Sequence, residues 1–470
     1  MLDSCPPASP RSARLLLEGQ TKEIVFGRKW LGSSWGIEKV RSMSTDRIRC
    51  TAEGCVNTIL PETAKRTGGV CMRCENKRLQ AERAEFIRKN RREVDPYAGL
   101  TDPVEIIREM HQKRAYDPLI IYKEPSRPKT TLYAGLNLAE LDRVASIAIN
   151  AKQTGNDDSA DEIARELAAF TAYDTSELAQ AWLNHGDCWP AVIFRGANTS
   201  VRDAVIRLLR SYETDGSTAP ALGHELCALA WIGDQEAQQC FVTWAKRPPI
   251  WQSSLHVEAN RYTPVAGWEI ENGKRRDLVH PNCYSLTATK SSESVARTVR
   301  AFQPAQDTCL GCQRGLVYMM EIDAGDPRLA FLNASIPQLR VLTCEVCMYF
   351  SDHLFAKISD DGIPRWHPSN ELPAPAPEGE FDRSPWAGVE LSIEPRPPMQ
   401  AVEWLNEISA SQIGGHPTWV QDDAYPKCPD CERTMMFIAQ LDNEDFKSEG
   451  ILYAFYCSSC RVTATGYQQS

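Results

Sequence analysis

The spacing of the cysteines constrains this chain more than any other feature of its sequence. Twelve of the 17 cysteines fall into three groups of four. The groups are Cys50, Cys55, Cys71 and Cys74; Cys309, Cys312, Cys344 and Cys347; and Cys428, Cys431, Cys457 and Cys460. Two thiolates on one tight Cys-x-x-Cys turn reach the same ion, and two such turns complete the tetrahedron that Zn²⁺ favours. The spacing therefore predicts three zinc sites.

Other uses of cysteine stay open beside zinc. One Cys-x-x-Cys pair alone can be a redox motif, and four thiolates can also hold an iron–sulfur cluster. A buried cysteine can act as a small apolar side chain. We favour that interpretation for the cysteines without a partner at ligand spacing, which are Cys188, Cys227, Cys240 and Cys283. A site with four thiolates has no open coordination position, so the three predicted zinc ions are structural and not hydrolytic.

The second and third cysteine groups belong to an internal repeat. Residues 309–323 align without a gap with residues 428–442, and Arg314 matches Arg433. Each copy predicts a first Cys-x-x-Cys turn, called a knuckle here, and then a strand covered on both faces. A loop and a second strand that leads to the second cysteine pair follow. The predicted strands are 316–322, 339–343, 435–441 and 452–456. The C-terminal half is therefore expected to be a duplicated, mostly β structure.

The composition is otherwise that of a globular protein, with 42% apolar and 24% charged residues. A formal net charge of −10 argues against a general nucleic-acid coat or a membrane-surface protein. No apolar run approaches the roughly 20 residues that a membrane helix needs. Residues 15–17 are too short for the core of a signal peptide. We therefore expect a cytoplasmic protein, where thiols stay reduced and clustered cysteines hold metal.

The middle of the chain has the periodicity of helices. Leu138, Leu141 and Val144 follow the spacing of one helix face. Residues 224–244 predict two helices separated at Gly233 and Asp234, where glycine ends the first helix and aspartate caps the second. This pattern resembles a HEAT-type repeat, which implies a solenoid with an extended binding face. A plain helical bundle is the alternative.

Together these signals predict an α+β multidomain fold. Residues 1–43 are interpreted as a disordered tail, or as the result of a start codon assigned too early with Met43 as the true start. The predicted parts that follow are a four-cysteine zinc finger with a basic helix at 44–95, a connecting segment at 96–136, a helical HEAT-like domain at 137–252, and the duplicated β domain at 253–470. A stretch with seven prolines, 371–399, is interpreted as a linker inside the last domain and not as a core element.

The C-terminal half resembles a known bacterial family. The residues that carry the resemblance are 412–421 (Gln-Ile-Gly-Gly-His-Pro-Thr-Trp-Val-Gln), the Cys428 knuckle, 437–442 and 450–456. They are similar to the YwqG-like family and, more distantly, to the C-terminal domain of programmed-cell-death-two proteins. The resemblance covers roughly residues 255–470. It implies a duplicated β-sheet fold that binds proteins and a role that is uncharacterised or associated with toxin immunity, and it offers no established catalytic residues to carry over. Residues 50–74 are similar to a small zinc finger that begins various bacterial proteins.

No catalytic constellation emerges from the sequence. His224-Glu225 lacks the second histidine of a His-Glu-x-x-His motif, and a surface or core histidine is the better interpretation. His185, Asp187 and Cys188 fall in an apparent turn between helices. His353 follows the second knuckle and is interpreted as a solvated loop residue. The sequence therefore predicts a protein that is not an enzyme.

A basic segment follows the first finger. Residues 76–92 hold seven basic residues, which are Lys77, Arg78, Arg83, Arg88, Lys89, Arg91 and Arg92. A knuckle followed by a basic helix can grip a phosphate backbone. It can equally be a solvated helix, or one that docks on an acidic partner or on the acidic remainder of this chain. The chain's −10 includes +3 from residues 1–43 and +4 from 44–95, so residues 96–470 carry −17 and favour the solvated or docking interpretation.

Three functional hypotheses follow. The first is a non-catalytic binding protein, most concretely a cytoplasmic immunity protein that neutralises a cognate secreted toxin. The chain's acidity supports it, because toxins that act on nucleic acid are often basic and an acidic inhibitor associates with them quickly. The second is a nucleic-acid- or ribosome-associated adaptor that works through residues 50–92. An enzyme with an unfamiliar site is a third alternative.

Overall fold

The computed structural model describes residues 47–215, 221–289, 298–371, 384–401, 409–446 and 448–469. The predicted tail at 1–43 and residues 372–383 of the predicted proline-rich linker lie outside these ranges. The described chain divides into two units. The smaller unit comprises residues 47–100 with 113–126, and the larger comprises 101–112 with the described residues from 127 onward.

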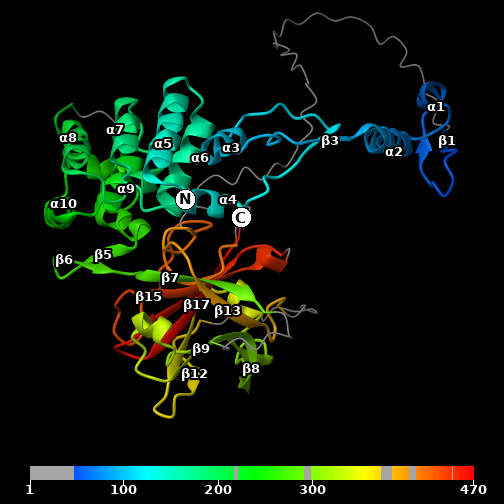
Figure 1. Ribbon diagram of the computed structural model, residues 1–470. Coiled ribbons are helices and arrows are strands. Elements are labelled where there is room, and N and C mark those ends of the chain that lie inside the picture. The colour runs from blue at the N-terminus through cyan, green and yellow to red at the C-terminus, as the bar shows by residue number, and fades with distance from the viewer. Residues whose placement is uncertain are drawn as a thin grey trace, which may run out of the picture. The chain divides into compact units, whose positions relative to one another are not determined.

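The smaller unit consists of a short finger followed by one long helix (Figure 1). Its elements are β1 (Ile48–Arg49), β2 (Thr58–Ile59), α1 (Pro61–Thr67), α2 (Met72–Asn90), β3 (Arg92–Val94) and β4 (Ile120–Tyr122). The strands β1 and β2 pair antiparallel, whereas β3 and β4 pair parallel. The basic helix expected after the finger is α2, and none of its residues is buried.

The larger unit begins with helices that stand side by side in Figure 1. They are α3 (Pro103–Met110), α4 (Lys129–Ala134), α5 (Leu138–Gln153), α6 (Asp157–Phe170), α7 (Ser176–Asn184), η1 (Ala191–Phe194), α8 (Thr199–Asp215), α9 (Leu222–Ile232) and α10 (Gln235–Lys246). Asn137 caps α5 with a complete capping box. The turn expected at Gly233 and Asp234 is confirmed. Gly233 ends α9 in the left-handed region, and the Asp234 side chain accepts the Ala237 N–H at the start of α10.

The second part of the larger unit is one antiparallel sheet. Its strands are β7 (His280–Ala288), β8 (Val299–Thr308), β9 (Gly315–Asp323), β10 (Gln338–Thr343), β11 (Leu354–Ile358), β12 (Pro364–Trp366), β13 (Glu390–Pro395), β14 (Gln412–Gly415), β15 (Met436–Asp442), β16 (Ile451–Cys457) and β17 (Val462–Gln468). Their order in the sheet is β10-β9-β8-β13-β7-β14-β15-β16-β17-β11-β12. The short helical turns η5 (Pro327–Leu332), η6 (Cys347–Tyr349) and η7 (Asn443–Phe446) lie in its loops.

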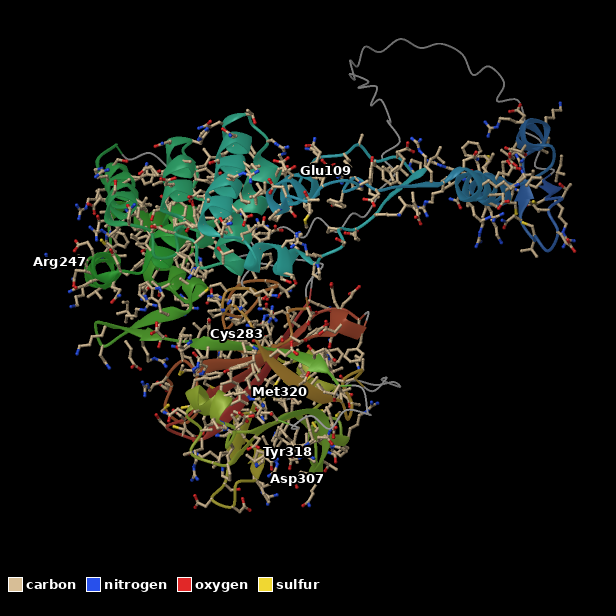
Figure 2. The ribbon with its side chains drawn as sticks, viewed as in Figure 1. Glu109, Arg247, Cys283, Asp307, Tyr318 and Met320 are labelled. Carbon is tan, nitrogen blue, oxygen red and sulfur yellow. The ribbon has the colours of Figure 1, made fainter. Side chains whose placement is uncertain are left out.

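The four strands expected in the repeat are confirmed to within one residue as β9, β10, β15 and β16. All seven residues of β16 are buried, as its continuous apolar run predicts. Figure 2 marks Met320 of β9 inside the β part, where it has no exposed surface. The sheet is therefore packed on both faces, and the cysteine knuckles lie at the ends of its strands.

The interpretation of residues 371–399 as a linker outside the core is wrong for the residues that the structure describes. Strand β13 lies between β7 and β8 in the sheet. Leu391 and Ile393 alternate with polar residues and are buried, and Trp386 is buried before them. The prolines of this stretch indicated a linker. Pro395 is nevertheless compatible with a strand, because it stands at the last position of β13, where a missing N–H costs little.

A separate hairpin joins the helical and sheet parts of the larger unit. It consists of β5 (Trp268–Glu271) and β6 (Lys274–Asp277), and it follows the short turns η2 (Ile250–Ser254), η3 (Ala259–Tyr262) and η4 (Pro264–Ala266). The Trp268 Nε1–H donates to the Ala230 carbonyl of α9 at 2.9 Å. Among the described residues, no helix is long and apolar enough to cross a membrane.

Candidate metal centres

The structure brings together each of the three predicted cysteine quartets. Within each quartet, the four sulfurs lie within 4.8 Å of one another. Sulfur–sulfur distances are 3.8 Å in the first quartet (Cys55–Cys71), 3.6 and 3.5 Å in the second (Cys309–Cys347 and Cys312–Cys344), and 3.8 Å in the third (Cys431–Cys457). A disulfide needs about 2.05 Å. Four sulfurs about 2.3 Å from one tetrahedral ion lie about 3.8 Å apart, so the quartets fit a metal ion.

The first centre is built at the N-terminus of α2. Cys71 is the residue before the helix, and its N–H donates to the Cys50 sulfur at 3.1 Å. The Asn57 amide donates to the Cys71 sulfur at 3.5 Å, and this bond lowers the pKa of the Cys71 thiol to about 6. Because helix N-termini favour negative charge, the start of α2 suits thiolates.

The second and third centres are each built on a backbone turn, and the two turns have the same conformation. The Cys309 N–H donates to the Arg314 carbonyl at 2.7 Å, and the Cys428 N–H donates to the Arg433 carbonyl at 2.8 Å. The residue after the second cysteine has a φ of 60° in both turns, at Gln313 and at Glu432. Two turns with the same hydrogen bonds thus present two sulfurs each in the same way.

Backbone N–H groups and neighbouring thiols favour a thiolate in the second centre. The Gly311 N–H lies 3.4 Å from the Cys309 sulfur, and the Cys347 N–H lies 3.4 Å from the Cys344 sulfur. Hydrogen bonding, chiefly from Cys344, lowers the pKa of Cys309 to about 5. Four sulfurs arranged as a tetrahedron could bind a metal ion, and they would leave that ion no open coordination position.

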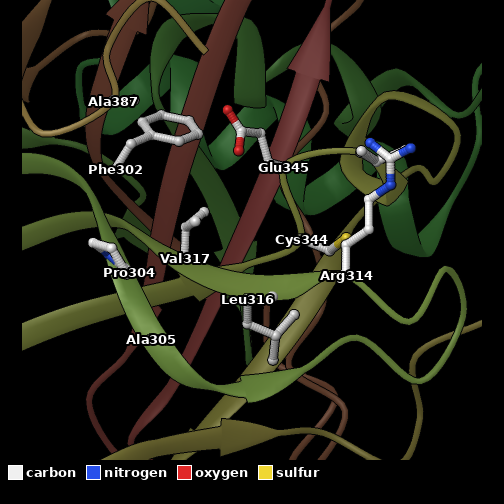
Figure 3. Close-up of a pocket in the computed structure, with 11 residues that line it drawn as sticks. Phe302, Pro304, Ala305, Arg314, Leu316, Val317, Cys344, Glu345 and Ala387 are labelled. Carbon is white, nitrogen blue, oxygen red and sulfur yellow. The ribbon is translucent and has the colours of Figure 1, made fainter. Parts of the chain in front are cut away.

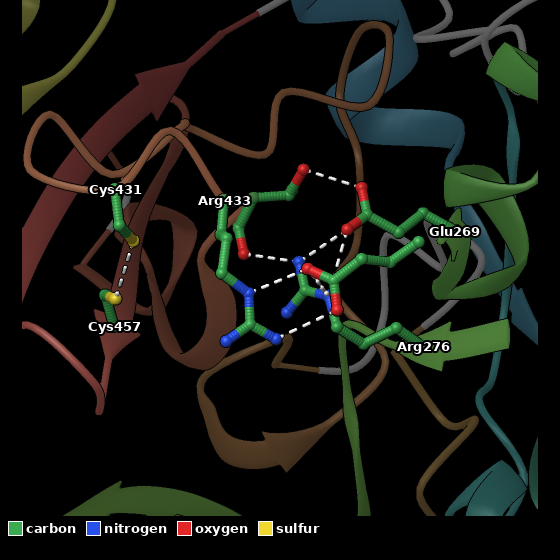
Figure 4. Close-up of polar contacts among 7 residues, drawn as sticks. Glu269, Arg276, Cys431, Arg433 and Cys457 are labelled. Carbon is green, nitrogen blue, oxygen red and sulfur yellow. Dashed lines mark hydrogen bonds and ion pairs between the residues drawn. The ribbon is translucent and has the colours of Figure 1, made fainter. Parts of the chain in front are cut away.

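Charged residues anchor the third centre on two sides. Arg433, two residues past Cys431, donates to the two oxygens of Glu271 at 2.7 and 2.9 Å. Figure 4 shows this contact beside the Cys431 and Cys457 sulfurs. On the other side, Asp430 accepts from the Lys357 ammonium and lies 3.1 Å from Nε2 of His367.

The second centre borders a cavity instead. This cavity has a volume of about 340 Å³, and Cys344, Arg314 and Glu345 contribute to its wall. Figure 3 shows the Arg314 side chain beside Cys344, and Phe302 on the opposite wall. Phe302 is 3% exposed and has a φ of 43°, a conformation that bulky residues rarely adopt.

Sequence reasoning missed one buried polar cluster in the helical part. Nε2 of His111 lies 3.0 Å from Glu166 and Nδ1 lies 3.2 Å from Glu162, while the Lys129 ammonium lies 2.7 Å from Glu166. Burial alone would lower the pKa of His111, but Glu166 and Glu162 raise it to about 9. Two cations thus balance two carboxylates, and the cluster is an ion-pair network. The only sequence signal is the i,i+4 spacing of Glu162 and Glu166 on α6.

The weaker sequence candidates do not assemble. The His185 ring contacts the Ala181 carbonyl, and Asp187 pairs with Lys152 at 2.7 Å. Burial raises the pKa of Cys188 far above its ordinary value, so it is a poor nucleophile. His224 packs against Trp189, with ring centroids 5.3 Å apart.

The interpretation of His353 as a solvated residue is wrong. Its Nε2 lies 3.0 Å from the Ala424 carbonyl. Its ring centroid lies 6.0 Å from that of Phe455. Burial lowers the pKa of His353. His353 is partly buried, and the residues that cover it, Ala424 and Phe455, are distant in sequence, which is why the sequence did not reveal these contacts.

The motif at 412–421 is held in place by three buried glutamines. The Gln412 amide donates to the carbonyls of Gly414 and His416. Gln440 accepts the Thr418 N–H at 3.0 Å and donates to the Ala410 carbonyl at 2.7 Å. Gln468 accepts the N–H groups of Val420 and Gln421. Gly414 allows a close approach of two backbone segments, because a Cβ at this position would lie 2.2 Å from the Asn282 carbonyl oxygen.

Comparisons with known proteins give a family match in the C-terminal strands and a relative that covers most of the chain. Residues 411–469 match a family described as a domain of unknown function (DUF1963). No solved structure matches the chain. The chain is 38% identical over 436 residues to a protein of Salmonella typhimurium named "Uncharacterized protein YpfL", and the match covers 90% of this chain and 100% of that protein. The chain therefore belongs to the same family as YpfL.

Proposed function

We propose that each cysteine quartet holds a structural Zn²⁺. Four sulfurs, tetrahedral spacing and the absence of a nitrogen or oxygen ligand among the four suit zinc. We also propose that the knuckle lobes of the β part are copies of one element, which the matching turns at Cys309 and Cys428 support. The paired helices α9 and α10 support the HEAT-like interpretation of the helical part.

We further propose that this is a non-catalytic cytoplasmic binding protein, most concretely an immunity protein that neutralises a basic toxin. The observation that carries the proposal is an acidic groove on the helices, defined by Leu138, Leu141, Asp142, Asp174 and Glu177, with a volume of about 740 Å³. Leu138 is 68% exposed at its edge. An exposed apolar side chain beside several carboxylates suits a basic protein segment that carries an apolar residue.

Hydrogen bonds hold the acidic side chains of the groove in fixed orientations. Tyr173 lines it and donates its hydroxyl to the Asp142 carboxylate at 2.9 Å. Asp174 accepts both the N–H and the hydroxyl of Ser176, which fixes its carboxylate at the start of α7. A partner would therefore meet carboxylates that are already oriented, so little ordering is needed on binding.

The test is to identify the neighbouring gene and, where it encodes a secreted toxin, to co-express that toxin with this protein. We expect the two proteins to co-purify and the toxin to lose its toxicity. Combining Asp142→Asn, Asp174→Asn and Glu177→Gln should slow association at least about tenfold, because the charges that steer encounter are lost. The matched control combines Glu236→Gln, Asp360→Asn and Glu371→Gln, which removes the same charge outside the groove. Neutralisation that is unchanged in the groove variant would contradict the proposal.

The second candidate function, a nucleic-acid- or ribosome-associated adaptor, is favoured by α2. The helix is exposed along its whole length. Arg78 pairs with Glu75 and Glu82, and Arg88 and Lys89 pair with Glu85. No ion pair occupies Arg73, Lys77 or Arg83 within the described chain, which leaves these cations available for phosphate.

Salt-dependent retention on single- and double-stranded nucleic acid tests this candidate. Replacing Arg73, Lys77, Arg83 and Arg91 with glutamine should abolish retention and flatten the dependence of affinity on salt. Replacing the paired residues Arg78, Arg88 and Lys89 should have a smaller effect. Failure of the unmodified protein to bind at low salt would end this candidate and leave the immunity proposal untouched.

A further inference from the structure

The β5–β6 hairpin contacts the helical part through its first and second strands. Trp268 is buried, and its Nε1–H donates to the Ala230 carbonyl at 2.9 Å. Arg275 donates to the Gly233 carbonyl at 2.9 Å, and its guanidinium lies 5.1 Å from the Trp268 ring centroid. The hairpin therefore holds the carbonyl end of α9, just before the turn into α10.

The same hairpin contacts the residues that directly follow the first cysteine pair of the third centre (Figure 4). Glu271 accepts both bonds from Arg433. Glu269 accepts the Thr434 hydroxyl at 2.6 Å, and Arg276 donates to the Thr434 carbonyl at 2.6 Å. All these partners are groups of Arg433 and Thr434, which follow the Cys428–Cys431 knuckle in the sequence.

The contacts thus form one continuous chain from the third centre to α9. The knuckle positions Arg433 and Thr434, these residues hold the β5–β6 hairpin, and the hairpin holds the Gly233 turn. At the second centre, the equivalent arginine is Arg314, whose side chain lines the cavity beside Cys344. The contacts with the hairpin therefore come from the arginine of the third centre.

We propose that the third cysteine centre is a metal-dependent latch between the β part and the helical part. Without a shared ion, four thiols have no common partner, and the 428–433 turn loses the constraint that orients Arg433. The bidentate contact with Glu271 then opens and the hairpin leaves the Gly233 turn. Loss of metal from this one centre would loosen the α9–α10 end of the helical part, and the chain could respond to zinc supply.

The first experiment separates the two centres in the full chain. Hydrogen exchange is compared for Cys431→Ser and for the matched variant Cys312→Ser, each with its zinc content measured. We expect Cys431→Ser to raise exchange in residues 222–246 and 268–277 at least about tenfold, because local opening becomes easier. Cys312→Ser should lose one zinc and leave these two segments at the exchange rate of the unmodified protein.

The second experiment breaks the latch and keeps the metal. Glu271→Gln removes the ion pair with Arg433 and touches no ligand, so the variant should retain its full zinc content and fold. We expect the same two segments to exchange faster, whereas the control Glu394→Gln on β13 should change neither. Unchanged exchange in Glu271→Gln, or equal effects of Cys431→Ser and Cys312→Ser on residues 222–246, would overturn the proposal.

Discussion

Gln440 satisfies backbone groups that no neighbouring strand reaches. Its side chain is fully buried, accepts the Thr418 N–H and donates to the Ala410 carbonyl. An apolar residue of the same size would leave both backbone groups buried without a partner. Each such group costs about 1 to 3 kcal/mol. Gln440 therefore supports the backbone of the 412–421 motif from strand β15.

Replacing Gln440 with methionine should lower the free energy of unfolding by about 3 kcal/mol, because the volume is kept and the hydrogen bonds are lost. Denaturant unfolding measures the change. The control is Gln421→Met, whose side chain is exposed and should change stability by less than about 0.5 kcal/mol. Equal stability of the two variants would contradict the role of Gln440.

His416 makes stability depend on pH. Burial lowers the pKa of its imidazole from 6.5 to about 4, and the ring packs on Trp231 with centroids 4.9 Å apart. Below pH 6.5 the imidazole binds a proton in the unfolded chain but not in the folded chain. The contribution of His416 to the free energy of unfolding is therefore complete above pH 6.5 and decreases as the pH falls toward 4. The loss amounts to about 3 kcal/mol for this residue. His280, with a pKa of about 4, adds to it in the same direction.

Unfolding by urea at about pH 7.5 and about pH 5 tests this dependence. The difference in stability between the two pH values should be smaller for His416→Gln than for the unmodified protein. The exposed His185→Gln should behave like the unmodified protein. His111 acts in the opposite direction, because its pKa is raised to about 9 and its contribution is lost as the pH rises through that value.

At the scale of elements, α2 is expected to depend on metal binding at the first cysteine quartet. None of its residues is buried, so tertiary packing does not support it. Its support consists of ion pairs such as Arg78–Glu75 and the ligands Cys71 and Cys74 at its start. A polar helix of this kind is stable only when such local interactions hold it.

Chelation of the metal should therefore melt α2 before any other long helix. We expect hydrogen exchange in residues 72–90 to rise on addition of a chelator, whereas α6, whose core face is buried, stays protected. Salt at about 0.5 M should increase the effect, because it screens the Glu–Arg pairs. Protection of residues 72–90 that survives chelation would refute the dependence.

The sequence predicted which cysteines lie together and missed the buried polar networks, for a physical reason. Two thiols on one turn are already close, so the spacing of Cys428 and Cys431 carries the geometry. The cluster of His111 with Glu162 and Glu166 forms only after α3 packs near α6, and no local pattern encodes that contact. Strand β13 was missed because its prolines outweighed the alternation of Leu391 and Ile393.

At the scale of the whole molecule, the metal content is the broadest prediction. Elemental analysis should return close to three zinc ions per chain, and fewer than two would contradict the assignment of the quartets. Replacing Cys431 or Cys457 with serine should destabilise the C-terminal strands severely. The reason is that the free energy with which a structural zinc ion binds contributes directly to the free energy of folding. Thermal unfolding with and without added zinc measures the effect.

The position of β7 in the sheet determines how this protein must acquire its fold. Its two neighbours are β13 and β14, and Leu286 pairs with Ile393 across more than 100 residues. Closing so long a loop costs entropy before any contact repays it, so the sheet is expected to fold slowly. Until residues 390–415 have been synthesised, β7 has no partner on either side and exposes its backbone to other chains. Expression at low temperature, or with a chaperone that shields strand edges, should therefore raise the yield of folded protein.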